Sequence, residues 1–368
     1  MSTIREISRD LLRAGVAFYT KQWPDYSRLI LMADIPSWSI AHDMLELAHL
    51  ARQLGLQTRS PFFAVHGQKQ SVFIGSHFDL LLSDRWFQTN HRLGTAYFHG
   101  KPGQGVKEFD LCFQKLEKKH HLVHRIQVSC DSMLKVVLST GIAPKKVHLI
   151  PIGINPTFFN QQTSETRMFA RRNFGIPHNA FVVGSFQKDG NGWGEGLDPK
   201  MIKGPDIFVK TMGLLNKKVG NLVVLLSGPA RGYTKMKLKE AGVQYVHHQV
   251  KEYSDVGKLY HALDVYMIPS REEGGPKAVL ESMASGIPLI ATRVGQALDL
   301  VQHGENGWLV ENEDVEGLAN SAYHILELGD AKQVIASKAI ATAADNTYIS
   351  QLPKWKDFFK GFVESHIR

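Results

Sequence analysis

Short apolar runs of strand length alternate with longer segments of helical periodicity along most of the chain, and this alternation restricts the fold more than any other feature. Residues 27–34 (SRLILMAD) form a compact apolar run. In residues 41–55 (AHDMLELAHLARQLG), apolar side chains recur at helical spacing and a glycine follows them. Strands this apolar must be covered on both faces, as in parallel sheets flanked by helices. The pattern therefore predicts an α/β fold.

The same reasoning assigns the other elements, in two successive series. In the first series, strands are predicted at 62–67, 78–84, 95–100, 125–130 and 145–153, with a helix at 131–141. In the second series, strands are predicted at 180–186, 221–228, 242–250, 264–270 and 288–295, and helices at 203–217, 255–263, 276–286 and 317–329. Two such series indicate two Rossmann-like parallel-sheet domains facing across a cleft.

The boundary between the two series is expected at residues 151–166, where Pro, Asn and Gly cluster and the periodicity lapses. This places one domain at 1–152 and a second at 153–351. The last residues, 352–368, are predicted to form an amphipathic helix that packs on either domain, including back on the first. A length of 368 residues suits two cores better than one.

Composition narrows the class of protein. A hydrophobic content of 43% is that of a globular protein, and the two cysteines, Cys112 and Cys130, supply no disulfide framework. The first residues do not read as a signal peptide, and no apolar run is long enough to span a membrane. These features predict a cytoplasmic protein.

The positive charge is concentrated in the first domain. The net charge is +8, and residues 1–150 hold 19 Lys and Arg against 12 Asp and Glu. A basic half of this kind suits a phospholipid surface or a phosphorylated acceptor, and a merely solubilising surface explains it equally well. Residues 4–15 carry an apolar helical face that allows peripheral attachment at the inner face of the membrane, although such a face more often packs in a core. No nucleic-acid partner is expected.

The most informative segment is 269–295 (PSREEGGPKAVLESMASGIPLIATRVG), which follows the predicted strand 264–270. Gly275 is expected to cap a helix that begins at Pro276. Backbone amides at such a helix start bind phosphate, and adjacent glycines let a ligand come close to the backbone. The predicted phosphate-binding positions in this segment are Gly274, Gly275, Pro276, Lys277 and Ala278.

Two glutamates flank this glycine pair. Glu273 stands before the expected helix and Glu281 in its second turn, so one side chain reaches the helix tip and the other reaches a group beside the helix. Carboxylates accept hydrogen bonds from paired hydroxyls such as those of a sugar or a ribose. Phosphate at the tip with hydroxyls on both sides indicates a nucleotide sugar. On spacing alone, an ordinary helix start with an exposed glutamate pair fits equally well.

The segment resembles the donor-site signature of the retaining glycosyltransferases of family 4, enzymes with the GT-B fold and an E-x7-E motif. Glu273 and Glu281 match the two glutamates of that motif, and residues 281–310 match the usual continuation. Upstream, residues 128–159 are similar to the family's passage between domains. The resemblance covers roughly 125–315 and hardly extends into the first domain.

The resemblance implies a role for particular residues. Glu281 would take the donor's ribose hydroxyls, and Glu273 would contact the transferred sugar. The family's Lys-Gly pair, which holds the diphosphate, is matched by Lys203-Gly204. Its Gly-Arg pair is matched only in part, because Gly184 is followed by Ser185. Three possibilities stay open: Lys188 substitutes for the arginine, Lys203 and the helix tip suffice, or the chain binds donors weakly.

Other candidate residues come from the loops. His99 lies at the end of the predicted strand 95–100, where family members often have a histidine that contacts the sugar or the acceptor. Asp34, Pro36 and Trp38 stand in place of the family's first glycine-rich loop and are candidates for an acceptor pocket, although Trp38 suits a core equally well. The glycine-rich stretch 190–196 (GNGWGEG) lacks a strand-to-helix setting and is interpreted as a mobile insertion.

Several other chemistries find no support in the sequence. The chain contains no Asp-x-Asp for a metal-held diphosphate, no His-Glu-x-x-His, no Cys-x-x-Cys, no Walker loop and no G-x-G-x-x-G. No metal site and no cofactor are expected; the nucleotide sugar would be a substrate.

We therefore predict a metal-independent hexosyltransferase or other glycosyltransferase of glycan or polysaccharide biosynthesis. It would act with retention of configuration on a glycan, lipid-linked or small-molecule acceptor. The catalytic candidates are Glu273, Lys203 and His99. The alternatives are a non-catalytic sugar-nucleotide-binding relative and a sugar-nucleotide epimerase of the same fold.

Overall fold

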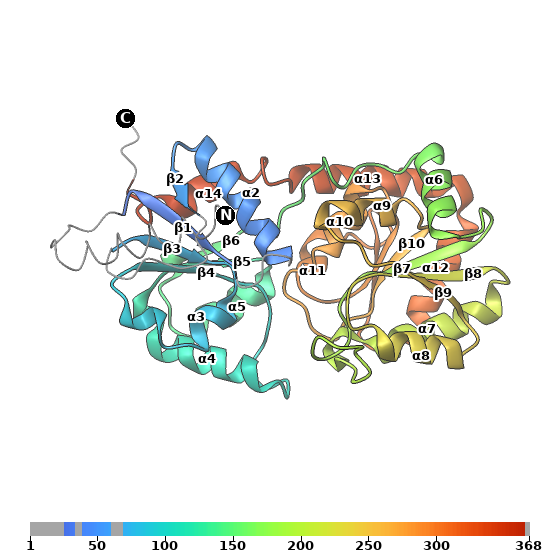
Figure 1. The fold of residues 1–368 in the computed structure, drawn as a ribbon, viewed down its shortest axis with the longest axis horizontal. Helices are drawn as coiled ribbons and strands as arrows, with labels where there is room; N and C mark the ends of the chain where they lie inside the picture. The colour runs from blue at the N-terminus through green and yellow to red at the C-terminus, as the bar shows by residue number, and fades with distance from the viewer. Residues whose placement is uncertain (1–25, 34–38, 60–68, 365–368) are drawn as a thin grey trace, which may run out of the picture. The chain divides into compact units, whose positions relative to one another are not determined.

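The computed structural model describes residues 26–33, 39–59 and 69–364, and the chain divides into two compact units (Figure 1). Unit 1 comprises Met1–Ile150 with Gln351–Arg368, and unit 2 comprises Pro151–Ser350. Each unit is built on one six-stranded sheet, and the paired strands of both sheets run parallel. The predicted α/β class with two parallel sheets is confirmed. The predicted strand 62–67 lies outside the described residues.

The sheet of unit 1 has the strand order β2-β1-β3-β4-β5-β6. Its strands are β1 (Arg28–Met32), β2 (Gln57–Arg59), β3 (Ser71–Ile74), β4 (Arg92–Tyr97), β5 (Val123–Val128) and β6 (Val147–Leu149). The order changes direction between β1 and β3, so the carboxyl ends of these strands lie at the switch point of the sheet.

Helices cover both faces of this sheet (Figure 1). The helices of the unit are α2 (Ser39–Gln53), α3 (His77–Leu81), α4 (Lys107–Lys119), α5 (Asp131–Leu138) and α14 (Leu352–Phe359). Buried side chains of α3, α4 and α5, among them Leu80, Cys112 and Met133, share one core with the strands. On the other face Phe358 of α14 meets Phe73 of β3 edge to face, with ring centroids 5.4 Å apart.

One predicted element of unit 1 is wrong, and another is predicted too long. Residues 78–84 form no strand, because residues 78–81 belong to helix α3. The neighbouring strand is β3, which ends at Ile74, before the predicted segment. A short apolar run fits a buried strand and a buried helical turn equally well, so periodicity could not decide between them. The predicted helix 352–368 ends at Phe359, because the chain turns at Gly361 with φ 71°. The carbonyl of Phe362 then accepts a hydrogen bond from Ser71 Oγ at 2.5 Å.

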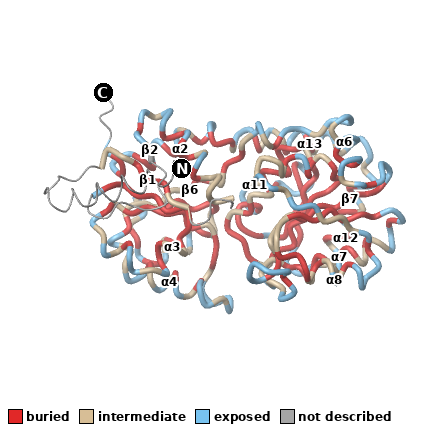
Figure 2. The backbone as a smooth tube through the Cα atoms, viewed as in Figure 1, coloured by how far each residue is buried: buried red, intermediate tan, exposed pale blue. Residues whose placement is uncertain are grey.

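The sheet of unit 2 has the order β12-β11-β10-β7-β8-β9, the doubly wound arrangement with its switch point between β7 and β10. Its strands are β7 (Phe181–Ser185), β8 (Leu222–Leu226), β9 (Gln244–His247), β10 (Val265–Ile268), β11 (Leu289–Thr292) and β12 (Trp308–Val310). The strands β7, β8, β10, β11 and β12 are buried throughout, whereas the edge strand β9 is partly exposed (Figure 2).

Alternate strand residues of unit 2 point into two cores. Its helices are α6 (Ser164–Phe174), α7 (Pro205–Lys218), α8 (Gly232–Glu240), α9 (Val256–Tyr260), α10 (Ala278–Ala284), α11 (Gln296–Leu300), α12 (Val315–Glu327) and α13 (Lys332–Asp345). Val183 faces the core shared with α7, α8 and α12, whereas its neighbour Val182 faces the core shared with α6, α9, α10 and α13. Figure 1 shows these two helix groups on opposite sides of the sheet.

A buried ion pair fastens α6 to the sheet of unit 2. Helix α6 begins at Ser164, within the stretch where periodicity lapses, and Thr163 caps it in a reciprocal capping box with Thr166. The side chain of Arg171 is fully buried and donates to Asp264 Oδ2 at 2.7 Å. It also donates to the carbonyls of three neighbouring residues, Ala262, His178 and Ala180. Asp264 also pairs with Arg167 and accepts from the Val182 amide, so the one guanidinium of Arg171 is part of a larger buried network.

Candidate active site

The predicted donor-site residues gather at the switch point of unit 2. Lys203 lies in a 3-10 turn, η4 (Met201–Lys203), between β7 and α7, and Glu273 lies in the loop after β10. Glu281 lies in the first turn of α10. In open parallel sheets, ligands bind beyond the carboxyl ends of the strands at such a point.

Lys203 and Glu273 form the ion pair at the centre of this cluster. Lys203 Nζ lies 2.6 Å from Glu273 Oε1, and only 7% of the glutamate side chain is exposed. The same carboxylate oxygen accepts a hydrogen bond from Ser270 Oγ at 2.9 Å. Gln187 joins the cluster, because its Nε2 donates to the Lys203 carbonyl at 2.7 Å and its Oε1 lies 3.3 Å from Ser270 Oγ. An ammonium has three donors, so the one that meets Glu273 leaves capacity for an anionic ligand.

The backbone around Lys203 is held against the end of β10. Gly204 adopts φ 64°, and a Cβ atom there would lie 2.0 Å from the Pro269 carbonyl oxygen, so only glycine fits this close approach. The amide of Arg271 donates to the Ile202 carbonyl at 2.8 Å. Because the turn and the loop are bonded to each other, Lys203 and Glu273 are placed together although 70 residues separate them.

Arg271 reinforces the same junction, and sequence reasoning did not single it out. Its two terminal nitrogens donate to the two oxygens of Asp206 at 2.8 and 2.9 Å, and its Nε pairs with Glu313 at 2.7 Å. Hydrogen bonding to Asp206 is the main reason that the pKa of Arg271 is raised. This fork-to-fork pair fixes the loop that carries Glu273 to the first turn of α7. In the sequence, the only local signal for this role of Arg271 was its position next to the glutamates.

Two tyrosine hydroxyls hold the carboxylate of Glu281. Tyr260 of α9 donates to Oε2 at 2.9 Å, and Tyr253, in the 3-10 turn η5 (Tyr253–Asp255), donates to Oε1. Burial and then the charge of Glu281 raise the pKa of Tyr260 well above its ordinary value, so this hydroxyl stays protonated and acts as a donor. Glu281 thus already binds a pair of hydroxyls, the chemistry expected of it toward a ribose. The sequence analysis missed both tyrosines.

The predicted helix start in this loop is wrong by two residues. Helix α10 begins at Ala278, with Lys277 at the N-cap, so Gly275 is not the cap, Pro276 is not helical, and Glu281 lies in the first turn rather than the second. The carbonyl of Pro276 accepts from the Val279 amide at 3.1 Å and from Gln296 Nε2 at 3.0 Å. These bonds hold Pro276 in a turn ahead of the helix.

The loop 274–278 also packs on the segment after β11. The carbonyl of Gly274 accepts from the Gln296 amide at 2.7 Å, and a Cβ at Gly295 would lie 2.2 Å from that carbonyl oxygen. Lys277 directs its ammonium to the ring of Tyr253, 4.4 Å from the centroid. Phosphate binding by Gly274, Gly275, Pro276, Lys277 and Ala278 stays a prediction.

The family's arginine is absent after Gly184, but Arg231, from the loop after β8, contacts Ser185. Arg231 donates to the Ser185 carbonyl at 2.6 Å and to the Ser227 carbonyl at 2.8 Å, and its Nε lies 3.0 Å from Asp189 Oδ1. Its side chain is 0% exposed. Arg231 therefore stabilises the ends of β7 and β8 and does not present a cation to a surface ligand.

The neighbouring candidates Gly184 and Lys188 have structural partners. A Cβ at Gly184 would lie 2.3 Å from Leu263 Cδ1, so core packing already requires glycine there. Lys188 Nζ lies 3.9 Å from the centroid of the Trp193 ring, and burial lowers the pKa of this lysine. A role for either residue toward phosphate stays a prediction.

His99 lies in unit 1, just beyond β4, and is largely buried among aromatic rings. Its ring stacks on Phe98 and meets Phe109 edge-on, with centroids 5.1 Å away in each case. A second histidine, His77 at the start of α3, stacks on Tyr97 at 4.2 Å and faces His99 at 6.3 Å. Sequence analysis did not single out His77, which directly precedes the segment 78–84 that was assigned to a strand. Contact of His99 with a sugar or an acceptor stays a prediction.

Replacing His77 by phenylalanine will reduce the loss of folding stability that occurs as the pH falls from 7 to 5. Burial lowers the pKa of His77 from 6.5 to about 3, so between these values the unfolded state binds more protons and the folded state loses stability as pH falls. From pH 7 to pH 5 this one group costs about 2 kcal/mol. Urea unfolding at both pH values will show that loss in the wild type and not in His77→Phe. An equal loss in both proteins would contradict the prediction; His121→Phe, at an exposed position, is the control.

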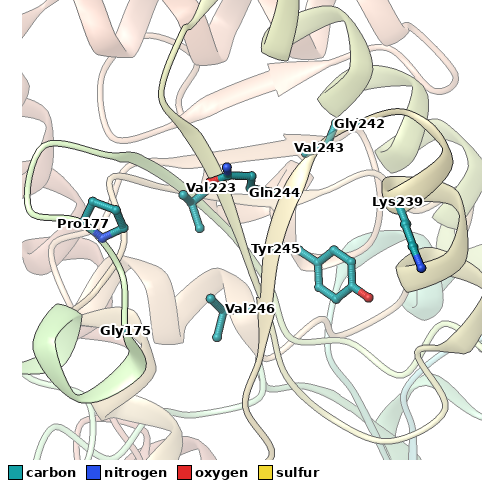
Figure 3. A pocket seen from close by; sticks show the side chains of 9 residues that line it. All are labelled: Gly175, Pro177, Val223, Lys239, Gly242, Val243, Gln244, Tyr245 and Val246. Carbon is teal, nitrogen blue, oxygen red and sulfur yellow. The ribbon is translucent and has the colours of Figure 1, made fainter.

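A cavity of about 400 Å³ lies elsewhere on unit 2 (Figure 3). It lies where α6 and α8 end and β9 begins, and is lined by Gly175, Pro177, Val223, Lys239, Gly242, Val243, Gln244, Tyr245 and Val246. The candidate site lies at the opposite, carboxyl ends of the strands, and the two share no residue.

Some predicted features lie outside the described residues: the candidate acceptor pocket at Asp34, Pro36 and Trp38, and the apolar helical face at 4–15. Within the described part of the chain, no helix is both long and apolar enough to cross a membrane. In the same part, no group of three or more His, Cys, Asp or Glu side chains is placed to hold a metal ion.

Comparison with known proteins assigns the region that carries this cluster. Residues 196–328 match the family model of the group 1 glycosyl transferases. The group 1 region contains Lys203, Glu273 and Glu281, whereas His99, Gly184 and Lys188 lie outside it.

Individual relatives give a consistent result. The chain is 25% identical over 230 residues to a D-inositol 3-phosphate glycosyltransferase of Corynebacterium urealyticum, covering 60% of this chain and 50% of that one. It is 28% identical over 158 residues to a lipopolysaccharide core biosynthesis mannosyltransferase of Rhizobium meliloti, covering 40% and 45%. The chain thus spans about half the length of these relatives.

Solved structures share the fold. A sucrose-phosphate synthase of Thermosynechococcus elongatus superimposes with a TM-score of 0.72 at 15% identity, over 91% of this chain and 98% of that one. HepE of Anabaena, in complex with UDP-glucose, superimposes with a TM-score of 0.71 at 15% identity, over 91% and 99%. At this identity the likeness concerns the fold alone, and it confirms the predicted GT-B class.

Proposed function

We propose that the chain is a glycosyltransferase of the group 1 type that transfers a sugar from a nucleoside diphosphate to an acceptor, with retention of configuration and without a metal ion. The observation that carries the proposal is the ion pair between the partly buried Lys203 and the buried Glu273 at the switch point, with a second buried glutamate, Glu281, eight positions after Glu273. The group 1 match of the same region supports it.

The chemistry follows from the charges. Transfer breaks the bond between the sugar carbon and the diphosphate oxygen, on which negative charge grows. It forms a bond from that carbon to an acceptor hydroxyl oxygen, whose proton the leaving diphosphate takes. The ammonium of Lys203, oriented by Glu273 and partly excluded from water, would stabilise this charge where a preformed cation is most effective. Glu273 and Ser270 would orient the sugar, and Glu281 would bind the ribose hydroxyls.

Ribose binding at Glu281 would compete with a tyrosine already in place. Tyr260 is fully buried, whereas Tyr253 is only partly so, and the Tyr253 hydroxyl occupies one oxygen of the carboxylate. The ligand would therefore displace the Tyr253 hydroxyl and leave Tyr260 to hold the other oxygen. The acceptor, a glycan, a lipid-linked sugar or a small molecule, would meet unit 1, with His99 as the candidate contact.

A thermal-shift panel of UDP, GDP, ADP and TDP, each with and without EDTA, tests the donor site. UDP is the first probe, because HepE binds UDP-glucose. A nucleotide at about 100 times its Kd adds about 2.7 kcal/mol to the stability of the folded chain. We expect one nucleotide to raise the melting temperature equally with and without EDTA.

Glu281→Gln should abolish that shift, and Glu327→Gln, at an exposed position on α12, should keep it. A shift that survives in Glu281→Gln would contradict the ribose assignment, and one that EDTA removes would contradict metal independence. If no nucleotide shifts the melting temperature, a relative that does not bind the donor becomes the better description.

A further inference from the structure

The glycine-rich insertion after β7, interpreted from its sequence as mobile, forms a loop with defined backbone contacts. Gly190 and Pro199 form a β-bridge, and the Asn191 amide donates to the Asp198 carbonyl at 2.8 Å. Asp189 is 1% exposed and accepts from Thr234 Oγ1 at 2.7 Å. Together with the Arg231 ion pair, these contacts close the loop and bury its base.

The tip of the loop docks on the start of α8. The amides of Gly232 and Tyr233 donate to the carbonyls of Glu195 and Gly196 at 2.6 and 2.9 Å. A Cβ at Gly196 would lie 2.2 Å from the backbone of Ala230, so the two segments pack without side chains between them. The loop therefore supplies the caps of this helix start and has a defined conformation.

This rigid loop presents a tryptophan to solvent. Trp193 is 57% exposed, although an indole is among the side chains with the most to gain from burial. Exposed glycines flank it at positions 192 and 194. Lys188 lies against the ring at 3.9 Å and restricts its orientation. The result is an aromatic surface that is ordered before any ligand arrives.

The loop leaves the sheet next to the centre of the candidate site. Gln187, the residue before Lys188, bonds to the carbonyl of Lys203, and its Oε1 lies 3.3 Å from the Ser270 hydroxyl that also donates to Glu273. The stem of the loop is thus joined to the proposed sugar end of the site, whereas the proposed ribose ligand Glu281 lies on α10.

We propose that Trp193 is a stacking subsite for a pyranose ring of a saccharide acceptor. One face of a pyranose is a sheet of C–H groups, which packs on the π face of an indole. The carboxylate of Glu195, exposed in the same loop, supplies acceptors for hydroxyls at the ring edge. This inference rests on the proposed function, because it gives unit 2 a contact of its own with the saccharide acceptor of that transfer.

Saturation-transfer NMR on the full chain with saturating UDP tests the subsite. The probes are methyl α-glucopyranoside, methyl α-mannopyranoside and methyl β-N-acetylglucosaminide. We expect at least one glycoside to receive saturation on its ring protons, and Trp193→Ala to reduce that signal about fivefold or more. Phe169→Ala removes an aromatic ring of comparable exposure on α6 and should leave the signal unchanged.

Two outcomes would overturn the subsite: an undiminished signal in Trp193→Ala, or no signal from any of the three glycosides with the wild type. The melting temperature of Trp193→Ala in UDP separates this result from failure of the proposed function. A retained UDP shift with a lost glycoside signal supports both assignments. A Trp193-dependent glycoside signal without a shift from any nucleotide in the panel keeps the subsite and rejects the donor site.

Discussion

Replacing Lys203 by methionine will slow release of the nucleoside diphosphate from its sugar about 10²- to 10³-fold. The ammonium is the cation that the candidate site holds 2.6 Å from Glu273, and it would meet the charge that grows on the leaving oxygen. The readout is single-turnover release of the nucleotide selected by the thermal-shift panel. Lys210→Met, at an exposed position on α7, removes the same charge away from the site and should release nucleotide at the wild-type rate.

A double variant separates the effect of Lys203 on transfer from its effect on stability. Lys203→Met leaves Glu273 buried without its cation, which also lowers the melting temperature. In Lys203→Met/Glu273→Gln the unpaired charge is gone, so stability should recover while transfer stays slow. If the double variant regains transfer together with stability, Lys203 serves the fold and not the leaving group.

Replacing Arg171 by methionine will destabilise unit 2 by about 3–5 kcal/mol. The guanidinium is 0% exposed, and its loss removes one of the two cations that pair with Asp264 and the donors to the carbonyls of Ala262, His178 and Ala180. Methionine fills similar volume but satisfies none of these acceptors. Urea unfolding will measure the loss of stability, and hydrogen exchange of peptides from unit 2 will show that the loss lies in this unit.

Arg172→Met provides the matched control, because Arg172 is the next residue of α6 and is exposed. Its effect should stay within about 0.5 kcal/mol, as for most surface substitutions. Equal stability of the two variants would show that the buried network does not fasten α6 to the sheet.

Periodicity predicted β7, β8, β10 and β11 of unit 2 because each is a run of apolar residues bounded by glycine, proline or polar residues, and it also placed β9. It missed β12, which is only three residues long. It failed at 78–84, where the run is short and a helical turn buries the same leucines. It also misjudged the loop at 190–196, because glycines that indicate flexibility in a sequence are here the residues that allow close backbone contact with Ala230.

The amino-acid sequence by itself determined two parallel α/β sheets and the residues of the candidate donor site that carry local signals. Glu273 and Glu281 belong to this group, since they flank a glycine pair that follows a strand, whereas Lys203-Gly204 was found through the resemblance to the family 4 enzymes. The tertiary structure alone decided what these residues contact. Tyr253 and Tyr260 reach Glu281 across 28 and 21 residues, and Arg231 reaches Ser185 across 46. Hydrogen bonds and ion pairs join groups that the folded backbone brings together, and no local pattern records a partner so distant along the chain.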